Sequence, residues 1–262
     1  MIVDGKKIAN ELKAELSSEL RARDLKLRLD VILVGDNVAS EKYVERKRSV
    51  GEEIGIDVVV HELMGDIKQG DLEEELKRLA EDKRVNGIIV QLPLPKQINE
   101  KEILDLVPAE KDVDALSSEA RVLSPTVGAI REILARSNVD LANKKIVVVG
   151  QGKLVGRPTA LWLTQEGYNV SVVDSKTQNV DELLLSADII VSGAGSPELI
   201  TPDKIRDGVV IVDASTSESN GQLTGDADPA CANKCSVFTP VPGGVGPITV
   251  VMLFKNLFDL NK

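Results

Sequence analysis

A tyrosine and a lysine, Tyr43 and Lys47, stand four residues apart in a segment of helix-forming composition. This spacing places both side chains on one face of a helix, with Ser40 near the start of that helix. Such a pair is commonly solvated at a protein surface. The alternative is a catalytic site, because a lysine held near an apolar pocket has a lowered pKa and can transfer protons. Both interpretations stay open at this point.

Three further polar residues stand next to apolar runs. Gln91 ends the run GIIVQ (87–91), and the carboxyl end of a buried strand is the edge where open α/β sheets bind ligands. Its alternative role is to hydrogen-bond a loop backbone. Asp112 and Asp114 lie in the polar segment KDVD (111–114), where carboxylates commonly cap a helix or stay solvated.

A glycine-rich turn, GQGKLVG (150–156), follows the apolar run KIVVV and precedes a helical segment. Glycines let a backbone approach a pyrophosphate, and the helix N-terminus behind them supplies unpaired N–H groups. Pro158 suits the first turn of that helix. Asp174 ends the next apolar run, about twenty residues further on, as in dinucleotide-binding units. This context predicts nucleotide binding rather than a plain tight loop.

The segment PVPGGVGP (240–247) combines three prolines and three glycines in eight residues. These residues fix an unusual backbone path just before the last helical segment. Such a loop either forms the wall of a ligand site or is a rigid linker, and the residues alone favour neither.

The elements that must position these residues alternate between strands and helices. Continuous apolar runs predict strands of a parallel sheet that helices bury on both faces. The predicted strands are 29–34, 56–61, 87–91, 145–150, 169–174, 188–192, 209–213 and 236–238. The predicted helices are 39–54, 71–81, 126–137, 156–166 and 250–260. A polar stretch at 108–125 marks a domain boundary, and the second half has the spacing of a mononucleotide- or dinucleotide-binding βαβ unit.

Composition excludes several function classes. The 262 residues carry a net charge of −10 and six aromatic side chains (one Trp, two Tyr, three Phe), which disfavours a nucleic-acid binder. No apolar run reaches the ~18–20 residues of a membrane span, and the polar start is unlike a signal peptide. Cys231 and Cys235 form no disulfide framework, which fits the cytoplasm. No metal site is expected, since His61 is the single histidine and is predicted to end a strand.

Six segments, taken in this order, resemble the bifunctional methylenetetrahydrofolate dehydrogenase/methenyltetrahydrofolate cyclohydrolase family. They are VILVGDNVASEKYVERK (31–47), GIIVQLPLP (87–95), KDVDAL (111–116), VVVGQGKLVGRP (147–158), GDAD (225–228) and TPVPGGVGPITVVML (239–253). The resemblance implies an α/β protein with a folate-binding catalytic domain at 1–122 and a Rossmann-type NAD(P)-binding domain at 123–245. It also implies a C-terminal helix, 246–262, that packs back on the first domain, and a cleft for the folate between the domains.

The resemblance assigns roles on the folate side. Lys47 would be the catalytic lysine of the cyclohydrolase step, and Gln91 would hydrogen-bond and tune it. Tyr43 would pack beside the folate rings, and Asp114 would bind the polar edge of the pterin. The folate cleft would be lined by Gly243, Gly244 and Pro247.

On the cofactor side, the resemblance points to Gly150, Gln151, Gly152, Asp174, Ser175 and Thr216. NADP is the cofactor that the family favours. NAD is plausible here because Gln151 stands where the family has an arginine, and because an acid such as Asp174 commonly accepts hydrogen bonds from the ribose of NAD. Alternatively, Asp174 caps a turn with Ser175.

The implied activity belongs to one-carbon metabolism. It is the oxidation of 5,10-methylenetetrahydrofolate to 5,10-methenyltetrahydrofolate with NAD(P)+, followed by hydrolysis to 10-formyltetrahydrofolate. The implied partners are tetrahydrofolate derivatives and a second copy in a cytoplasmic homodimer, without nucleic acid or membrane. The chain departs from the family at Ala115 and Leu116, where D-V-D-G-F is usual, and in a shorter stretch at 115–126. The alternative is a nucleotide-binding homologue that has lost one or both activities and serves a regulatory role.

Overall fold

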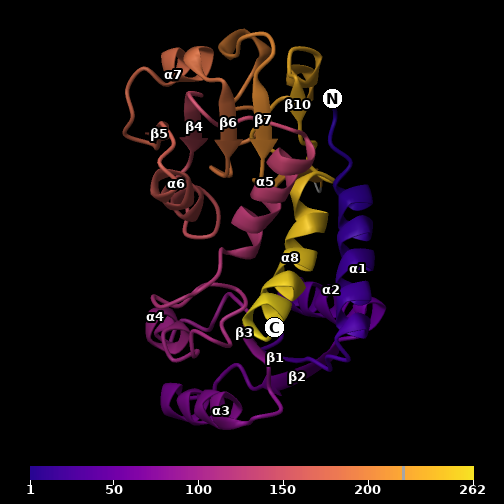
Figure 1. Cartoon of the computed structure of the whole chain (residues 1–262). Coiled ribbons are helices and arrows are strands. Elements are labelled where there is room, and N and C mark those ends of the chain that lie inside the picture. Colours follow the sequence, from indigo (N-terminus) through magenta and orange to yellow (C-terminus); the bar gives the residue numbers. More distant parts are fainter. Residues whose placement is uncertain (220–221) are drawn as a thin grey trace. The chain divides into compact units, whose positions relative to one another are not determined.

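The computed structural model of the chain describes residues 1–219 and 222–262 and divides the chain into two compact units (Figure 1). The first unit comprises Asn10–Pro125 and Val250–Lys262, and the second comprises Met1–Ala9 and Thr126–Thr249. Each unit contains its own parallel sheet. Within the described residues, no helix is long and apolar enough to cross a membrane.

The first unit is built on a three-stranded parallel sheet in the order β2-β1-β3. Its strands are β1 (Arg28–Val34), β2 (Asp57–Leu63) and β3 (Gly87–Val90). Its helices are α1 (Gly5–Ala22, from Asn10 on), α2 (Val38–Ile54), α3 (Gln69–Glu81), α4 (Glu100–Leu104) and the end of α8 (Val245–Leu260) from Val250.

Both faces of the central strand β1 are buried, which explains why its sequence is an almost continuous apolar run. Successive side chains of a strand point to opposite faces. Val31 of β1 lies in a hydrophobic cluster that includes Phe254 and Phe258 of α8. Its neighbour Ile32 lies in a second cluster, which includes Leu76 of α3.

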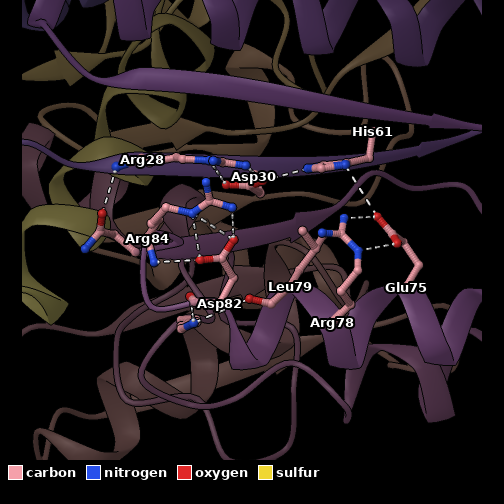
Figure 2. A network of polar contacts seen from close by, with 10 residues as sticks. Arg28, Asp30, His61, Glu75, Arg78, Leu79, Asp82 and Arg84 are labelled. Carbon is pink, nitrogen blue, oxygen red and sulfur yellow. Dashed lines mark hydrogen bonds and ion pairs between the residues drawn. The ribbon is translucent and has the colours of Figure 1, made fainter.

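One acid interrupts the apolar run of β1, and a polar network satisfies it (Figure 2). Asp30 is fully buried and accepts from Arg28 Nε at 2.8 Å and Arg28 Nη2 at 2.7 Å. His61 Nε2 lies 2.6 Å from Asp30 Oδ1, and its Nδ1 lies 3.4 Å from Glu75 Oε1 of α3. The prediction that His61 ends its strand is wrong, because β2 continues to Leu63.

The second unit is built on a five-stranded parallel sheet in the order β10-β7-β6-β4-β5. Its strands are β4 (Ile146–Val149), β5 (Val170–Val173), β6 (Ile189–Ser192), β7 (Val210–Asp213) and β10 (Val237–Phe238). A separate antiparallel pair is formed by β8 (Ser217–Ser219) and β9 (Gln222–Thr224). The helices of the second unit include α5 (Pro125–Arg136), α6 (Gly156–Gln165), α7 (Val180–Ser186) and the 3-10 helices η1 (Pro202–Lys204) and η2 (Pro229–Asn233).

The strand order creates a switch point at β4. The chain runs from β4 to its neighbour β5 and then returns to β6 on the opposite side of β4, as the arrangement in Figure 1 shows. In open α/β sheets, ligands bind outside the carboxyl ends of strands at such a point. The glycine-rich turn 150–156 begins where β4 ends, so the topology places that turn at the expected binding edge.

The strands predicted from the sequence are confirmed, with ends displaced by one or two residues. Helices α1, α4 and α7 and the β8–β9 pair were not predicted. Helix α8 begins at Val245, five residues before the predicted start. The start was predicted too late because the proline-rich pattern indicates a loop. In the structure Pro247 lies in the first turn of α8, where a missing N–H is tolerated.

Candidate active site

The lysine and the glutamine singled out in the sequence meet in the first unit. Lys47 lies on α2 and is 8% exposed, and its Nζ donates to Gln91 Oε1 at 2.9 Å. Gln91 directly follows β3, and its Nε2 donates to the carbonyl of Leu92 at 2.8 Å. Because the amide nitrogen is bound to that carbonyl, the amide oxygen is the atom presented to the lysine.

Helix α2 is held in place at its start by the same loop. Asn37 caps the helix by accepting from the backbone N–H of Ser40 at 3.0 Å. The Ser40 hydroxyl donates to the Leu92 carbonyl at 3.3 Å, so this carbonyl joins the start of α2 to the end of β3. From the sequence, Ser40 is predicted only to lie near the start of this helix. Tyr43 lies one turn before Lys47 and is 52% exposed.

Burial sets the charge of the lysine. It lowers the pKa of the Lys47 ammonium, and the negative charge of Asp114 opposes this effect. Burial likewise raises the pKa of the Asp114 carboxyl, against the attraction of Lys47, while Asp112 adds repulsion. A lysine that loses its proton more easily than usual is suited to proton transfer near neutral pH.

The two acids of the segment KDVD differ in their surroundings. Asp112 is buried and accepts from the backbone N–H groups of Leu116 at 3.4 Å and Ser117 at 2.9 Å, so it caps the following turn. Asp114 interacts electrostatically with Lys47, and within the described residues no hydrogen bond to its carboxylate is present. Within the described residues, the acceptor capacity of the Asp114 carboxylate is therefore not used by the protein.

The glycine-rich turn in the second unit has room for backbone but not for side chains. Gly150 has φ +95°, and a Cβ atom there would lie 2.7 Å from the carbonyl oxygen of Gly193. A Cβ atom on Gly156 would overlap the carbonyl of Gly150. At Gly152, by contrast, the nearest such atom would be 3.8 Å away. The turn thus leaves open space beside the N-terminus of α6, and this arrangement fits a dinucleotide pyrophosphate.

The residues predicted to select the cofactor lie around this turn and after the neighbouring strands. The exposed side chain of Gln151 donates to the Gly150 carbonyl at 2.8 Å. Asp174, directly after β5, accepts at Oδ1 from the backbone N–H of Lys176 at 2.8 Å and from the Thr177 hydroxyl at 3.0 Å. These bonds lower the pKa of the Asp174 carboxyl. Asp174 therefore caps its turn, with Thr177 as its side-chain partner rather than Ser175.

The proline- and glycine-rich loop before α8 belongs to the second unit. Gly243 has φ +109°, which favours glycine. Gly244 N–H donates to the Pro240 carbonyl at 2.8 Å, and Pro247 lies in the first turn of α8. This loop thus has a defined conformation of its own.

Thr216, the remaining residue predicted to bind the cofactor, follows β7 and is exposed.

Two buried acids that end β7 and follow β9 were not predicted from the sequence to be functional. Asp213 and Asp226 are 1% and 0% exposed, and both accept hydrogen bonds from the loops behind the glycine-rich turn. For Asp226 the available signal was its place in the family-like segment GDAD (225–228), whereas Asp213 lies outside the family-like segments. Nothing in the local pattern distinguished them from capping residues.

Comparison with known proteins identifies the relatives of both units. Residues 3–114 match the family model of the tetrahydrofolate dehydrogenase/cyclohydrolase catalytic domain, and residues 124–262 match that of its NAD(P)-binding domain. The "Bifunctional protein FolD" of Macrococcus caseolyticus is 38% identical over 97% of this chain and 95% of that protein.

Solved structures agree with this result. The crystal structure of bifunctional FolD from Campylobacter jejuni is 36% identical and has a TM-score of 0.95, covering 99% of this chain and 98% of that one. A FolD structure from Trypanosoma brucei, complexed with NADP cofactor and inhibitor, is 32% identical with a TM-score of 0.91, covering 99% and 96%. The predicted resemblance and two-domain α/β fold are confirmed: this chain belongs to the tetrahydrofolate dehydrogenase/cyclohydrolase family.

Proposed function

We infer that this chain is a bifunctional enzyme of one-carbon metabolism. It oxidises 5,10-methylenetetrahydrofolate to 5,10-methenyltetrahydrofolate with NAD(P)+ and hydrolyses the methenyl form to 10-formyltetrahydrofolate. The observation that carries this inference is the buried Lys47–Gln91 pair, 2.9 Å apart, in a chain of this family. A regulatory homologue without catalysis would have no need to keep a lysine amine out of water, where its burial costs free energy.

In the hydrolytic step, Lys47 transfers the proton. Its neutral amine accepts a proton from water as the water oxygen bonds to the bridging carbon. The same proton then passes to the folate nitrogen whose bond to that carbon breaks. The second proton of the water leaves the hydroxyl group for the solvent as the formyl C=O bond forms. Because the methenyl form is a cation, the step consumes only water and releases one proton. Gln91 holds the amine in position and, being uncharged, leaves the pKa of Lys47 below its usual value.

The other residues of the folate side position the substrate. The Asp114 carboxylate accepts hydrogen bonds from the N–H groups of the pterin. The absence of a hydrogen bond to this carboxylate within the described residues supports this role, since its neighbours Lys47 and Asp112 interact with it only electrostatically. Tyr43 packs beside the folate rings, and its exposure leaves its ring accessible. Gly243, Gly244 and Pro247 contribute a wall of the folate site.

The second unit holds the dinucleotide. When bound, NAD(P)+ accepts the hydride from the methylene carbon, so the protein has to supply only orientation for this step. Gly150, Gln151 and Gly152 would hold the pyrophosphate at the N-terminus of α6, and Asp174, Ser175 and Thr216 would be further cofactor-binding residues. We accordingly assign residues 1–122 with 246–262 to folate binding and catalysis, and residues 123–245 to cofactor binding.

The preference for NADP over NAD is weakened in this chain. Gln151 offers a hydrogen-bond donor but no charge to a 2′-phosphate, and Asp174 places a carboxylate near it. The cap formed with Lys176 and Thr177 keeps the Asp174 carboxyl ionised, because these bonds lower its pKa. A carboxylate and a phosphate dianion repel each other.

The enzyme acts as a homodimer in the cytoplasm. Strand β2 lies at one edge of its sheet and pairs with β1 on one side, and an unpaired strand edge is a surface suited to a second chain. Cys231 and Cys235 are free thiols, in keeping with a reducing compartment.

Lys47→Met is expected to reduce methenyl hydrolysis by ~10²-fold or more, the usual scale for a lost acid–base group. Hydride transfer should fall less, since its chemistry belongs to the cofactor. The two products are followed separately, with Lys42→Met, an exposed lysine on the same helix, as the matched control. Unimpaired hydrolysis by a folded Lys47→Met protein would remove Lys47 from the mechanism.

The pH profile of methenyl hydrolysis tests the state of the lysine. Hydrolysis requires neutral Lys47, so the rate should rise with pH through an ionisation below 10.5, in the direction that burial shifts this pKa. Gln91→Glu places a carboxylate against Nζ, favours the charged amine and should move this ionisation to higher pH. Gln97→Glu, at an exposed position, should leave the profile unchanged. An unaltered profile in Gln91→Glu would show that another group titrates.

For the cofactor, we expect catalytic efficiencies with NADP and NAD to lie within ~100-fold of each other, or about 2.7 kcal/mol. Gln151→Arg should shift the ratio strongly toward NADP by supplying a charged fork for phosphate. Asp174→Ser should shift it less, and Gln165→Arg, at the far end of α6, should not. A wild-type preference for NADP beyond ~10³-fold contradicts this prediction.

Sedimentation equilibrium tests the homodimer. The expected mass is twice the 28.2 kDa of one chain at micromolar concentration, and dilution should shift the distribution toward one chain. A mass of 28.2 kDa that does not change with concentration would show a monomer.

A further inference from the structure

Asp226 is a fully buried acid that accepts three hydrogen bonds from the segment 192–196 of the second unit. Its Oδ2 accepts from the Ser192 hydroxyl at 2.6 Å and from the Ala194 N–H at 2.7 Å. Its Oδ1 accepts from the Ser196 N–H at 2.6 Å. A buried carboxylate is tolerated only with such partners, and hydrogen bonds to a charged acceptor are about twice as strong as neutral ones. The acid therefore fixes the segment 192–196 that ends β6.

The segment 192–196 forms the wall against which the glycine-rich turn packs. Gly193 N–H donates to the Val149 carbonyl at 2.9 Å. A Cβ atom on Gly150 would lie 2.8 Å from the Cα of Ala194, and one on Gly193 would overlap the side chain of Val155. At Gly150 backbone thus meets backbone, and at Gly193 the backbone meets the β-branched side chain of Val155, which has little rotational freedom to absorb a shift. A displacement of this segment must move the turn.

Asp226 is itself fixed by the end of β7. Its backbone N–H donates to the Ser215 hydroxyl at 2.8 Å, and that hydroxyl donates to Asp213 Oδ1 at 2.6 Å. Asp213 Oδ2 accepts from the Ala227 N–H at 2.8 Å. The hydrogen bonds therefore run without a break from β7 through Asp226 to the segment after β6. A rigid frame stands behind the turn.

We propose that Asp226 is a positioning residue for the dinucleotide: through the segment 192–196 it sets the place of the glycine-rich turn that receives the pyrophosphate. This inference rests on the proposed function, because it assumes that the turn binds NAD(P). Asp226 touches no cofactor in this role. It acts through Ala194 and Ser196, whose N–H groups need two acceptor oxygens.

Asp226→Asn tests the proposal with little change of shape. Asparagine has one acceptor oxygen, so either amide orientation turns an NH2 group toward a backbone N–H. We expect the dissociation constant for NADPH, measured by the fluorescence of the bound nucleotide, to rise roughly tenfold or more. Methenyl hydrolysis without added dinucleotide should stay within about twofold of wild type, because it depends on Lys47 in the first unit.

Two further variants complete the experiment. Asp228→Asn makes the same change two residues away, at a cap of η2 that accepts from the Ala230 N–H, and it should leave NADPH binding unchanged. Ser192→Ala removes one donor to Asp226 and keeps the carboxylate, so it should weaken NADPH binding in the same direction but less. It decides the question if Asp226→Asn does not fold.

Three results would contradict the proposal. One is unchanged NADPH binding in folded Asp226→Asn and Ser192→Ala proteins. Another is a parallel loss of NADPH binding and methenyl hydrolysis, which indicates general destabilisation. A third is a loss in Asp228→Asn equal to that in Asp226→Asn. A wild-type protein that binds neither NADPH nor NADH would overturn the proposed function itself, a result distinct from these.

Discussion

The hydrogen bond from Lys47 to Gln91 is the interaction around which the first unit is organised. A buried amine needs an acceptor, and a charged one would keep it protonated. The amide oxygen of Gln91 meets both demands only because Leu92 binds the amide nitrogen. This geometry requires the end of β3 and the middle of α2 to keep fixed positions relative to each other. The two hydrophobic clusters on the faces of the sheet supply this rigidity.

The second unit contains buried acids instead of a buried amine, and hydrogen-bond donors stabilise them. Its buried acids are Asp213, which ends β7, and Asp226, which follows β9, and both accept hydrogen bonds from backbone N–H groups. Lysine in the first unit is kept easy to deprotonate, whereas these carboxylates are kept supplied with donors. The difference agrees with the proposed roles. A proton-transfer group has to change its charge during the reaction, whereas a group that holds a loop in place needs lasting hydrogen bonds.

The sequence predicted what depends on neighbouring residues and missed what depends on distant ones. Continuous apolar runs located the strands, and the strand–turn–helix context located the glycine-rich turn. The partners of the Asp226 carboxylate lie 30 to 34 residues away, and Asp30 contacts His61 across 31 residues. No local periodicity encodes such pairs. Helix α8 was predicted too short for a different reason, since prolines indicate a loop unless the first helical turn receives them.

Hydrogen bonding also separates the acids that build the fold from the one offered to a ligand. Asp30, Asp112, Asp213 and Asp226 are all buried, and each accepts at least two hydrogen bonds from the protein. Asp114 has only electrostatic partners in the part of the chain that the structure describes. Asp114 is partly buried, and an acid that loses part of its hydration without gaining a donor from the protein is less stable than one with donors. Its free energy improves when a ligand brings N–H groups to it, and this favours folate recognition at Asp114 over Asp112, although both belong to the same four-residue segment.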